Sequence, residues 1–279
     1  MGRVNPSFQT RSSFLAQDSK KSNALVTFGG IVLAVTVILT LLVYGSALRL
    51  PFYADDLQLI PWIKETPALA YWHTLNPYGD WRPLEFIVLR VIFLLTRALS
   101  PALLYGLNLV GHAFCATLTG LLIVRWGRFP RYVGFIAAVL FVFFPFAPNV
   151  VLWVSSISYP LVTGLSLSAL LLYLVARERD RLLLHLGSAL CTLMAGLVWE
   201  AGVVTAGGIL LAELLLRGRP KGGPYSRWVG AHLIASAIPL TAIFFVSSEV
   251  PTQLMTGLHP WYNIVALLQC LAYPLAQLP

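Results

Sequence analysis

Residues 24–48 read ALVTFGGIVLAVTVILTLLVYGSAL, without one charged side chain. A helix needs roughly 20 apolar residues to cross the hydrocarbon core of a bilayer, and this run exceeds that length. It is too long for the apolar core of a signal peptide, and no small-residue cleavage site follows it. We therefore expect a retained first membrane helix, preceded by a cytoplasmic N-terminal tail over residues 1–23.

The composition extends this interpretation to the whole chain. Hydrophobic residues make up 58% of the 279 residues and charged residues 11%, and the mean hydropathy is +0.78. These values are typical of a polytopic membrane protein. Further apolar segments cover residues 83–99, 102–124, 133–146, 157–175, 182–198, 201–216, 228–246 and 262–278. We expect one all-α transmembrane domain over residues 24–279, with about eight or nine membrane helices. The last segment is expected to be a short terminal helix or to continue into a longer protein.

Basic residues gather in short segments between the apolar ones and give the chain its net charge of +8. Such a pattern is typical of cytoplasmic loops in membrane proteins and argues against a nucleic-acid partner. The segments contain Arg3, Arg11, Lys20 and Lys21; Arg125, Arg128 and Arg131; Arg177, Arg179 and Arg181; and Arg217, Arg219 and Lys221. If they face the cytoplasm, the first loop, over residues 50–82, is extracytoplasmic.

This topology raises a conflict in the segment from Pro83 to Val124. An extracytoplasmic first loop and a cytoplasmic loop at Arg125 require an odd number of crossings, whereas hydropathy suggests two helices. The first of these, over residues 83–99, is short and carries Glu85, Arg90 and Arg97, so it is a candidate for an interfacial helix or a half-span. The alternative is that the Arg125 loop departs from the charge rule, which is a statistical bias.

The first loop contains a polar island between apolar segments. It begins with Asp55-Asp56 and ends with Asp80-Trp81-Arg82. Between them, residues 57–74 mix tryptophans and aliphatic residues with a few charges, as expected of an amphipathic helix at the lipid headgroups. On the same side of the membrane we expect Trp153 and Glu200. An ionisable residue such as Glu200 between apolar segments is costly unless it reaches water or a partner, which favours a functional role.

Several short motifs follow one another between residues 25 and 216. They are Asp55-Asp56, Trp81-Arg82-Pro83-Leu84, YGLNLVGH at residues 105–112, Phe144-Pro145 with Trp153, and Trp199-Glu200-Ala201-Gly202-Val203. In this order they resemble the membrane half of the GT-C superfamily of polyprenyl-phosphate-sugar-dependent glycosyltransferases. The resemblance is to the branch of protein O-mannosyltransferases and transmembrane-and-tetratricopeptide mannosyltransferases. That branch commonly has Tyr-Arg-Pro-Leu, His-Pro followed by Glu-Ala-Val and Trp, and Lys-Glu-Val-Gly-Val at the corresponding places.

The chain departs from this pattern on what would be the acceptor side. Phe144 stands where the histidine is usual, and Asn149-Val150-Val151 stands in place of Glu-Ala-Val. The segment from Ser155 to Tyr159 also lacks the usual arginine and aspartate. These differences leave open a changed acceptor or a loss of activity.

The resemblance implies an inverting hexosyltransferase that uses a polyprenyl-phosphate-linked sugar as donor and a protein, lipid or glycan as acceptor. Such a reaction needs a base for the acceptor hydroxyl and a cation for the leaving phosphate. The resemblance implies that one aspartate of the pair is the base, with Asp55 favoured slightly over Asp56, which would assist or bind a divalent metal ion. Arg82 would hold the phosphate, because a guanidinium pairs with it through two N–H groups.

Around these residues, Trp81, Glu200 and Trp153 are candidate substrate contacts. The short basic loops and the lack of a eukaryotic retention signal favour a bacterial plasma membrane, with the active site on the extracytoplasmic side.

Structural roles remain open for the same residues. Asp55 and Asp56 could cap an interfacial helix, and Arg82 could be an anchor at the interface beside Trp81. Trp153, Trp261 and Tyr262 fit an aromatic belt, and His112 fits a buried histidine bonded to a neighbouring helix. Cys115, Cys191 and Cys270 lie far apart in apolar segments, as expected of packing residues and not of a metal site or a disulfide framework.

Other functional classes are a non-catalytic membrane subunit of the same fold and, less favoured, a transporter. A transporter would place its ionisable residues in broken helices at mid-membrane.

Overall fold

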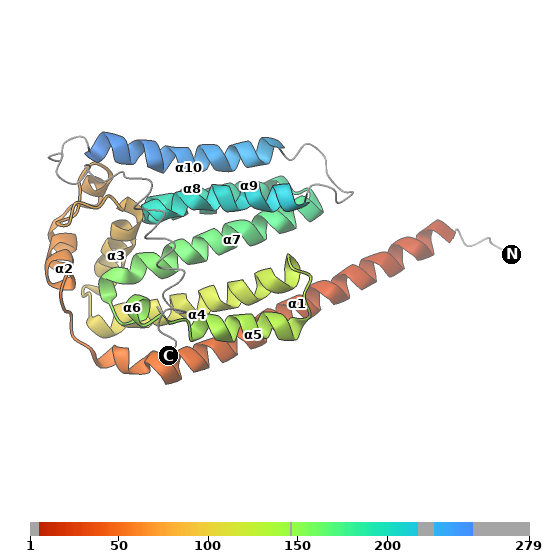
Figure 1. Cartoon of the computed structure of the whole chain (residues 1–279), viewed down its shortest axis with the longest axis horizontal. Helices are drawn as coiled ribbons and strands as arrows, with labels where there is room; N and C mark the ends of the chain where they lie inside the picture. Colours follow the sequence, from red (N-terminus) through yellow and green to blue (C-terminus); the bar gives the residue numbers. More distant parts are fainter. Residues whose placement is uncertain (1–5, 146, 217–225, 248–279) are drawn as a thin grey trace, which may run out of the picture.

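The structure, a computed structural model, describes residues 6–145, 147–216 and 226–247, and none of these residues lies in a strand. The helices that run along the bundle are α1 (Pro6–Tyr44), α4 (Pro101–Arg125), α5 (Arg131–Val142), α7 (Ser158–Arg179), α8 (Leu182–Val198), α9 (Val204–Leu216) and α10 (Ser226–Ser247) (Figure 1). Shorter elements are α2 (Asp56–Glu65), α3 (Pro83–Thr96) and α6 (Ala147–Val151), with 3-10 turns η1 (Gly45–Arg49), η2 (Ala68–Trp72), η3 (Val154–Ile157) and η4 (Glu200–Val203). The all-helical prediction is confirmed for this part of the chain.

The apolar segments predicted from the sequence coincide with helices. The segment 182–198 matches α8 to the residue, and 102–124 matches α4 within one residue at each end. The first helix begins at Pro6 and so extends back through most of the expected N-terminal tail. The predicted helix over 262–278 lies outside the described residues.

Three helical segments in the described part of the chain are long and apolar enough to cross a membrane. They are Ala24–Arg49, Pro101–Arg125 and Val154–Arg179, and shorter apolar helices cover Arg131–Val142, Leu182–Val198 and Trp228–Ile243. Only 17% of the most apolar window in the first segment is buried inside the protein. Its large exposed side chains, such as Leu42, therefore present an apolar surface that suits lipid. These features are compatible with an integral membrane protein.

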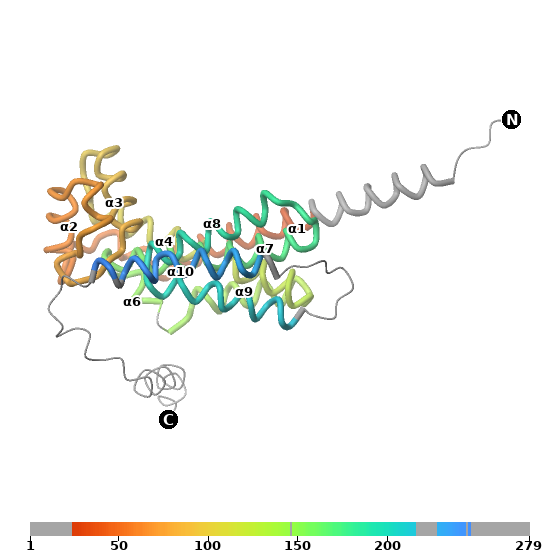
Figure 2. Tube along the Cα trace, turned by 90° about the horizontal axis from the view of Figure 1, so that it is seen from above, coloured from red at the N-terminus to blue at the C-terminus, as the bar shows by residue number. Residues whose placement is uncertain are grey.

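Helices α2 and α3 lie together at one end of the bundle and do not run along it (Figures 1 and 2). Within residues 83–124, only α4 therefore runs along the bundle. The α4–α5 and α7–α8 connections, with their arginines, lie at the opposite end (Figure 1). One helix along the bundle in this segment is compatible with the odd number of crossings that the charge pattern requires.

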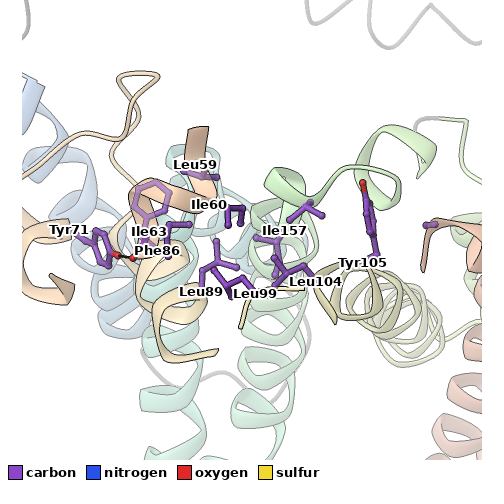
Figure 3. Packing of buried hydrophobic residues seen from close by; sticks show 12 residues of the cluster. Leu59, Ile60, Ile63, Tyr71, Phe86, Leu89, Leu99, Leu104, Tyr105 and Ile157 are labelled. Atoms are coloured by element: carbon purple, nitrogen blue, oxygen red, sulfur yellow. Dashed lines mark hydrogen bonds between the residues drawn. The ribbon is translucent and has the colours of Figure 1, made fainter. Parts of the chain in front are cut away.

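A cluster of buried apolar residues fastens α2 and α3 to this end of the bundle. It contains Leu59, Ile60, Ile63, Tyr71, Phe86, Leu89, Leu99, Leu104, Tyr105 and Ile157, which come from α2, η2, α3, α4, η3 and the α3–α4 connection (Figure 3). The Tyr71 hydroxyl donates a hydrogen bond to the Ile63 carbonyl at 2.9 Å. From α3, the Arg90 guanidinium donates to the carbonyls of Ile63 and Lys64 and so satisfies the end of α2. The polar island is therefore held against a buried apolar cluster.

Small residues allow the helices along the bundle to approach closely. A Cβ atom at Gly120 of α4 would lie 2.7 Å from the carbonyl oxygen of Gly134 in α5, and one at Gly134 would lie 2.6 Å from the carbonyl oxygen of Gly120. Close contact through small residues is typical of helices packed in a membrane. His112 of α4 is buried with Nε2 3.3 Å from the Val142 carbonyl at the end of α5, as predicted.

The cysteines within the described ranges are also packing residues. Cys115 is buried and Cys191 is half-buried, and neither forms a disulfide with a described residue. Cys270 lies outside these ranges.

Candidate functional site

Asp56 is fully buried and joins the start of α2 to the turn η3. One carboxylate oxygen, Oδ1, accepts a hydrogen bond from the backbone N–H of Ser155 at 2.8 Å, and Oδ2 faces the backbone N–H of Tyr53 at 3.4 Å. Burial raises the pKa of Asp56, while the two backbone hydrogen bonds act in the opposite direction. The contacts give Asp56 a structural role that holds two distant segments together.

Asp55 is placed differently from its neighbour. It is half-buried at the residue before α2, and its side chain makes no capping hydrogen bond. Its carboxylate forms no hydrogen bond or ion pair with any residue that the structure describes. Of the two aspartates, Asp55 is the one whose oxygens remain available to a substrate.

The turn at residues 76–80 connects Asp55 with Arg82. The side-chain oxygen of Asn76 accepts hydrogen bonds from the backbone N–H groups of Tyr78 and Asp80, at 2.9 and 2.8 Å. Gly79 has a φ of 85°, a left-handed conformation that a glycine adopts without strain. From this turn the Tyr78 hydroxyl donates a hydrogen bond to the Asp55 carbonyl at 3.0 Å. Burial, together with the nearby charges of Asp55 and Asp56, raises the pKa of Tyr78.

Arg82 lies at the start of α3, between two carboxylates. Its Nη2 is 3.4 Å from Asp80 Oδ1 and its Nε is 3.7 Å from Glu200 Oε2, and its guanidinium lies over the Trp199 ring at 5.6 Å from the centroid. The side-chain exposures are 18% for Arg82, 35% for Asp80 and 51% for Glu200. The Arg82 side chain is therefore held inside the site and does not extend freely to an interface.

Glu200 reaches solvent and also pairs with Arg82. These are the two ways in which an ionisable residue between apolar segments avoids the cost of burial. The second carboxylate oxygen of Glu200 accepts a hydrogen bond from the indole N–H of Trp199 at 2.8 Å. Trp199 also makes an edge contact with Tyr159, with ring centroids 4.5 Å apart. The 3-10 turn η4 thus brings Glu200, a residue far along the chain, to the polar island.

The two tryptophans predicted as substrate contacts pack against the island. Trp81 is buried, and its indole N–H donates to the Trp72 carbonyl at 3.2 Å. Trp153 is stacked on Tyr53 with centroids 6.1 Å apart, and its buried indole N–H has no acceptor among the described residues. The Tyr53 hydroxyl donates to the Leu152 carbonyl at 2.6 Å. Trp153 thus keeps a donor available, whereas Trp81 does not. Trp261 and Tyr262 lie outside the described residues.

The segment over residues 57–74 is helical, as predicted, in α2 and η2. Leu59, Ile60 and Ile63 form the face that packs on the bundle, while Leu57 and Leu69 are exposed. An exposed apolar edge on a helix at the end of the bundle suits contact with lipid headgroups.

Glu85 is part of the site and was not selected from the sequence. It lies one helical turn after Arg82, is 1% exposed, and its Oε2 has no hydrogen-bond partner in the described part of the chain. Burial raises the pKa of Glu85 to about 8, although the charge of Arg82 acts in the opposite direction. An ionisable residue inside an apolar segment, three positions after Arg82, is the signal that could have identified it.

Asp56, which the resemblance offers as a helper or metal ligand, already faces one backbone N–H group with each of its oxygens. Within the described ranges, no three His, Cys, Asp or Glu side chains are placed to share a metal ion.

Comparisons with protein-family models, curated proteins and solved structures give no match for this chain.

Proposed function

We propose that the protein is a membrane-embedded, inverting glycosyltransferase of the GT-C type. It takes a sugar from a polyprenyl-phosphate carrier and transfers it to a protein, lipid or glycan acceptor. The observation that carries the proposal is that one turn adjoins both groups: its Tyr78 hydroxyl bonds to the backbone carbonyl of Asp55, and its Asp80 carboxylate lies 3.4 Å from the Arg82 guanidinium. A base and a phosphate-binding cation are the two groups that such a transfer needs.

The proposed orientation follows from the ends of the bundle. The α4–α5 connection, whose flanking segment over residues 125–131 carries three arginines, lies at the end opposite to α2 and α3, and a basic end is typical of the cytoplasmic side. The site then faces the extracytoplasmic side of a plasma membrane, which we propose to be bacterial. With the described helices and the segment over 262–278, the chain would cross about eight times.

In the proposed reaction the Asp55 carboxylate takes the proton of the acceptor hydroxyl. The acceptor oxygen forms a bond to the anomeric carbon of the sugar from the face opposite the phosphate. The bond between that carbon and the phosphate oxygen breaks, and its electron pair remains on the phosphate. Arg82 stabilises this developing charge, while Asp56 keeps the start of α2 against η3.

Arg82 has hydrogen-bonding capacity left for a phosphate. Its contacts with Asp80 and Glu200, at 3.4 and 3.7 Å, are longer than the 2.7–2.9 Å of a good charge-assisted hydrogen bond. Its Nε is buried and has no hydrogen-bond partner among the described residues. A guanidinium offers five N–H donors, so one phosphate can bind without displacing every existing contact.

Native mass spectrometry of the purified protein tests this proposal. Wild type and Arg82→Ala would be incubated with polyprenyl-phosphate-mannose and polyprenyl-phosphate-glucose. We expect one carrier lipid retained by wild type and lost in Arg82→Ala. The matched control is Arg131→Ala, an exposed arginine at the other end of the bundle, which should retain the lipid. Equal retention by wild type and Arg82→Ala would contradict the assignment of Arg82.

A non-catalytic membrane subunit of the same fold is the second candidate. The hydrogen bond between Asp56 and the Ser155 N–H favours this candidate, because it gives the aspartate a structural role that requires no catalytic activity. This candidate differs in one outcome: Asp55 could then be replaced without loss of function.

A further inference from the structure

Glu85 is buried at the edge of the Arg82 site with a polar atom that no described residue satisfies. Its side chain is 1% exposed, and Oε2 has no hydrogen-bond partner within the described ranges. The same holds for Nε of Arg82, one helical turn away. A buried carboxylate without hydrogen bonds is costly, so the neutral acid is the form that this environment favours.

Three charged residues act on Glu85, and they come from different parts of the fold. Arg82 precedes α3, Asp80 belongs to the turn at residues 76–80, and Glu200 begins η4. With Glu85 neutral, one positive charge faces two negative ones. Ionisation of Glu85 would add a third negative charge, inside the protein and away from solvent.

The buried position of Glu85, one helical turn from Arg82, determines how strongly this extra charge would act on the guanidinium. An ionised carboxylate one turn from Arg82 would be the most deeply buried acid around the guanidinium, where screening by water is weakest. It would attract the guanidinium N–H groups and repel an anionic phosphate. The raised pKa of Glu85, about 8, places this ionisation just above neutral pH.

Building on the proposed function, we propose that Glu85 is a positioning residue that acts as a proton switch on Arg82. As a neutral acid it leaves the guanidinium available to the phosphate of the carrier lipid. When it loses its proton, its carboxylate occupies Arg82 and the carrier is released.

The test is the affinity for polyprenyl phosphate in lipid nanodiscs, measured from about pH 6 to about pH 10 for wild type and Glu85→Gln. We expect wild type to lose about tenfold in affinity across the alkaline half of this range, and Glu85→Gln to lose less than about twofold. Glutamine keeps the shape of the neutral acid, so a purely structural role for Glu85 would leave both proteins with the same pH profile. Ionisation of the lipid phosphate affects both proteins equally and cancels in the comparison.

Infrared spectroscopy supplies a readout that does not depend on the lipid. Wild type should show a protonated-carboxyl band at neutral pH that disappears at alkaline pH and is missing in Glu85→Gln. The control Glu178→Gln, at the opposite end, should titrate as wild type does, because Glu178 is an exposed partner of Arg125. A flat wild-type binding profile, or no such band, would overturn the switch and leave the carrier site standing. Failure of the lipid to bind at any pH would overturn the proposed function and the switch together.

Discussion

The carboxylate of Asp56 accepts a hydrogen bond from the backbone N–H of Ser155 at 2.8 Å, across 99 residues of sequence. This bond joins the first loop to the turn that precedes α7, and it is shielded from solvent because Asp56 is fully buried. The available carboxylate of Asp55 is consequently carried on a fixed segment.

Asp56→Ala should destabilise the protein by about 1–3 kcal/mol, because the Ser155 N–H is left without its acceptor in the interior. Thermal unfolding in detergent measures this difference. Asp55→Ala is the matched control and should unfold within about 0.5 kcal/mol of wild type, since Asp55 has no such bond. A large loss of stability in Asp55→Ala, or none in Asp56→Ala, would reverse the roles of the two residues.

Asp55→Asn should reduce sugar transfer by about 10²–10⁴-fold, because an amide cannot accept the proton of the acceptor hydroxyl. The measurement is transfer from a radiolabelled polyprenyl-phosphate sugar in membranes that express each variant. Carrier binding should survive in Asp55→Asn, which separates loss of the base from loss of the site. Near-normal transfer by this variant would exclude Asp55 as the base.

Glu85→Gln should change the dependence of stability on pH. The glutamate side chain ionises near pH 4.5 in the unfolded chain and near pH 8 in the folded protein, so the folded protein holds one more proton between these values. Wild type should therefore lose stability as the pH rises through this window, and the contribution of Glu85 should be constant above it. The difference in melting temperature between Glu85→Gln and wild type should grow in favour of the variant from about pH 5 to about pH 8. A difference that does not vary with pH would show that Glu85 titrates normally.

Gly120→Leu should separate α4 from α5, because even a Cβ atom at this position would come within 2.7 Å of the Gly134 carbonyl oxygen. We expect a loss of about 1–3 kcal/mol or more from overpacking, measured by unfolding in detergent. Gly30→Leu in α1 is the control, since nothing lies within 4 Å of its added Cβ. Unchanged stability in Gly120→Leu would mean that the two helices are not in contact there.

The helices could be predicted from the sequence because a long apolar run is a local signal and depends on no distant residue. The predicted segment 182–198 has the same bounds as α8, and the predicted segment 102–124 matches α4 within one residue at each end. The segment 83–99 forms the short α3, in which Glu85 is buried at the site and Arg90 bonds to the end of α2, and its position at the membrane interface stays a prediction.

The contacts that connect the residues of the site could not be predicted in the same way. The roles of Asp55 and Asp56 separate through a bond to Ser155, and nothing local to the pair indicates that partner. The apolar segment around Glu85 signals an unusual glutamate, but it does not indicate the burial or the residues of other elements that raise the pKa of Glu85. The number of membrane crossings and the identity of the substrates remain predictions.

The turn at residues 76–80 is a spacer between Asp55 and Arg82. Its Tyr78 hydroxyl holds the backbone of Asp55, while its Asp80 carboxylate lies against Arg82. In the proposed reaction, the distance between the base and the phosphate-binding group would therefore be set by a few residues that belong to neither helix. Lengthening this turn by one residue would then be expected to change the size of acceptor that fits between the two groups.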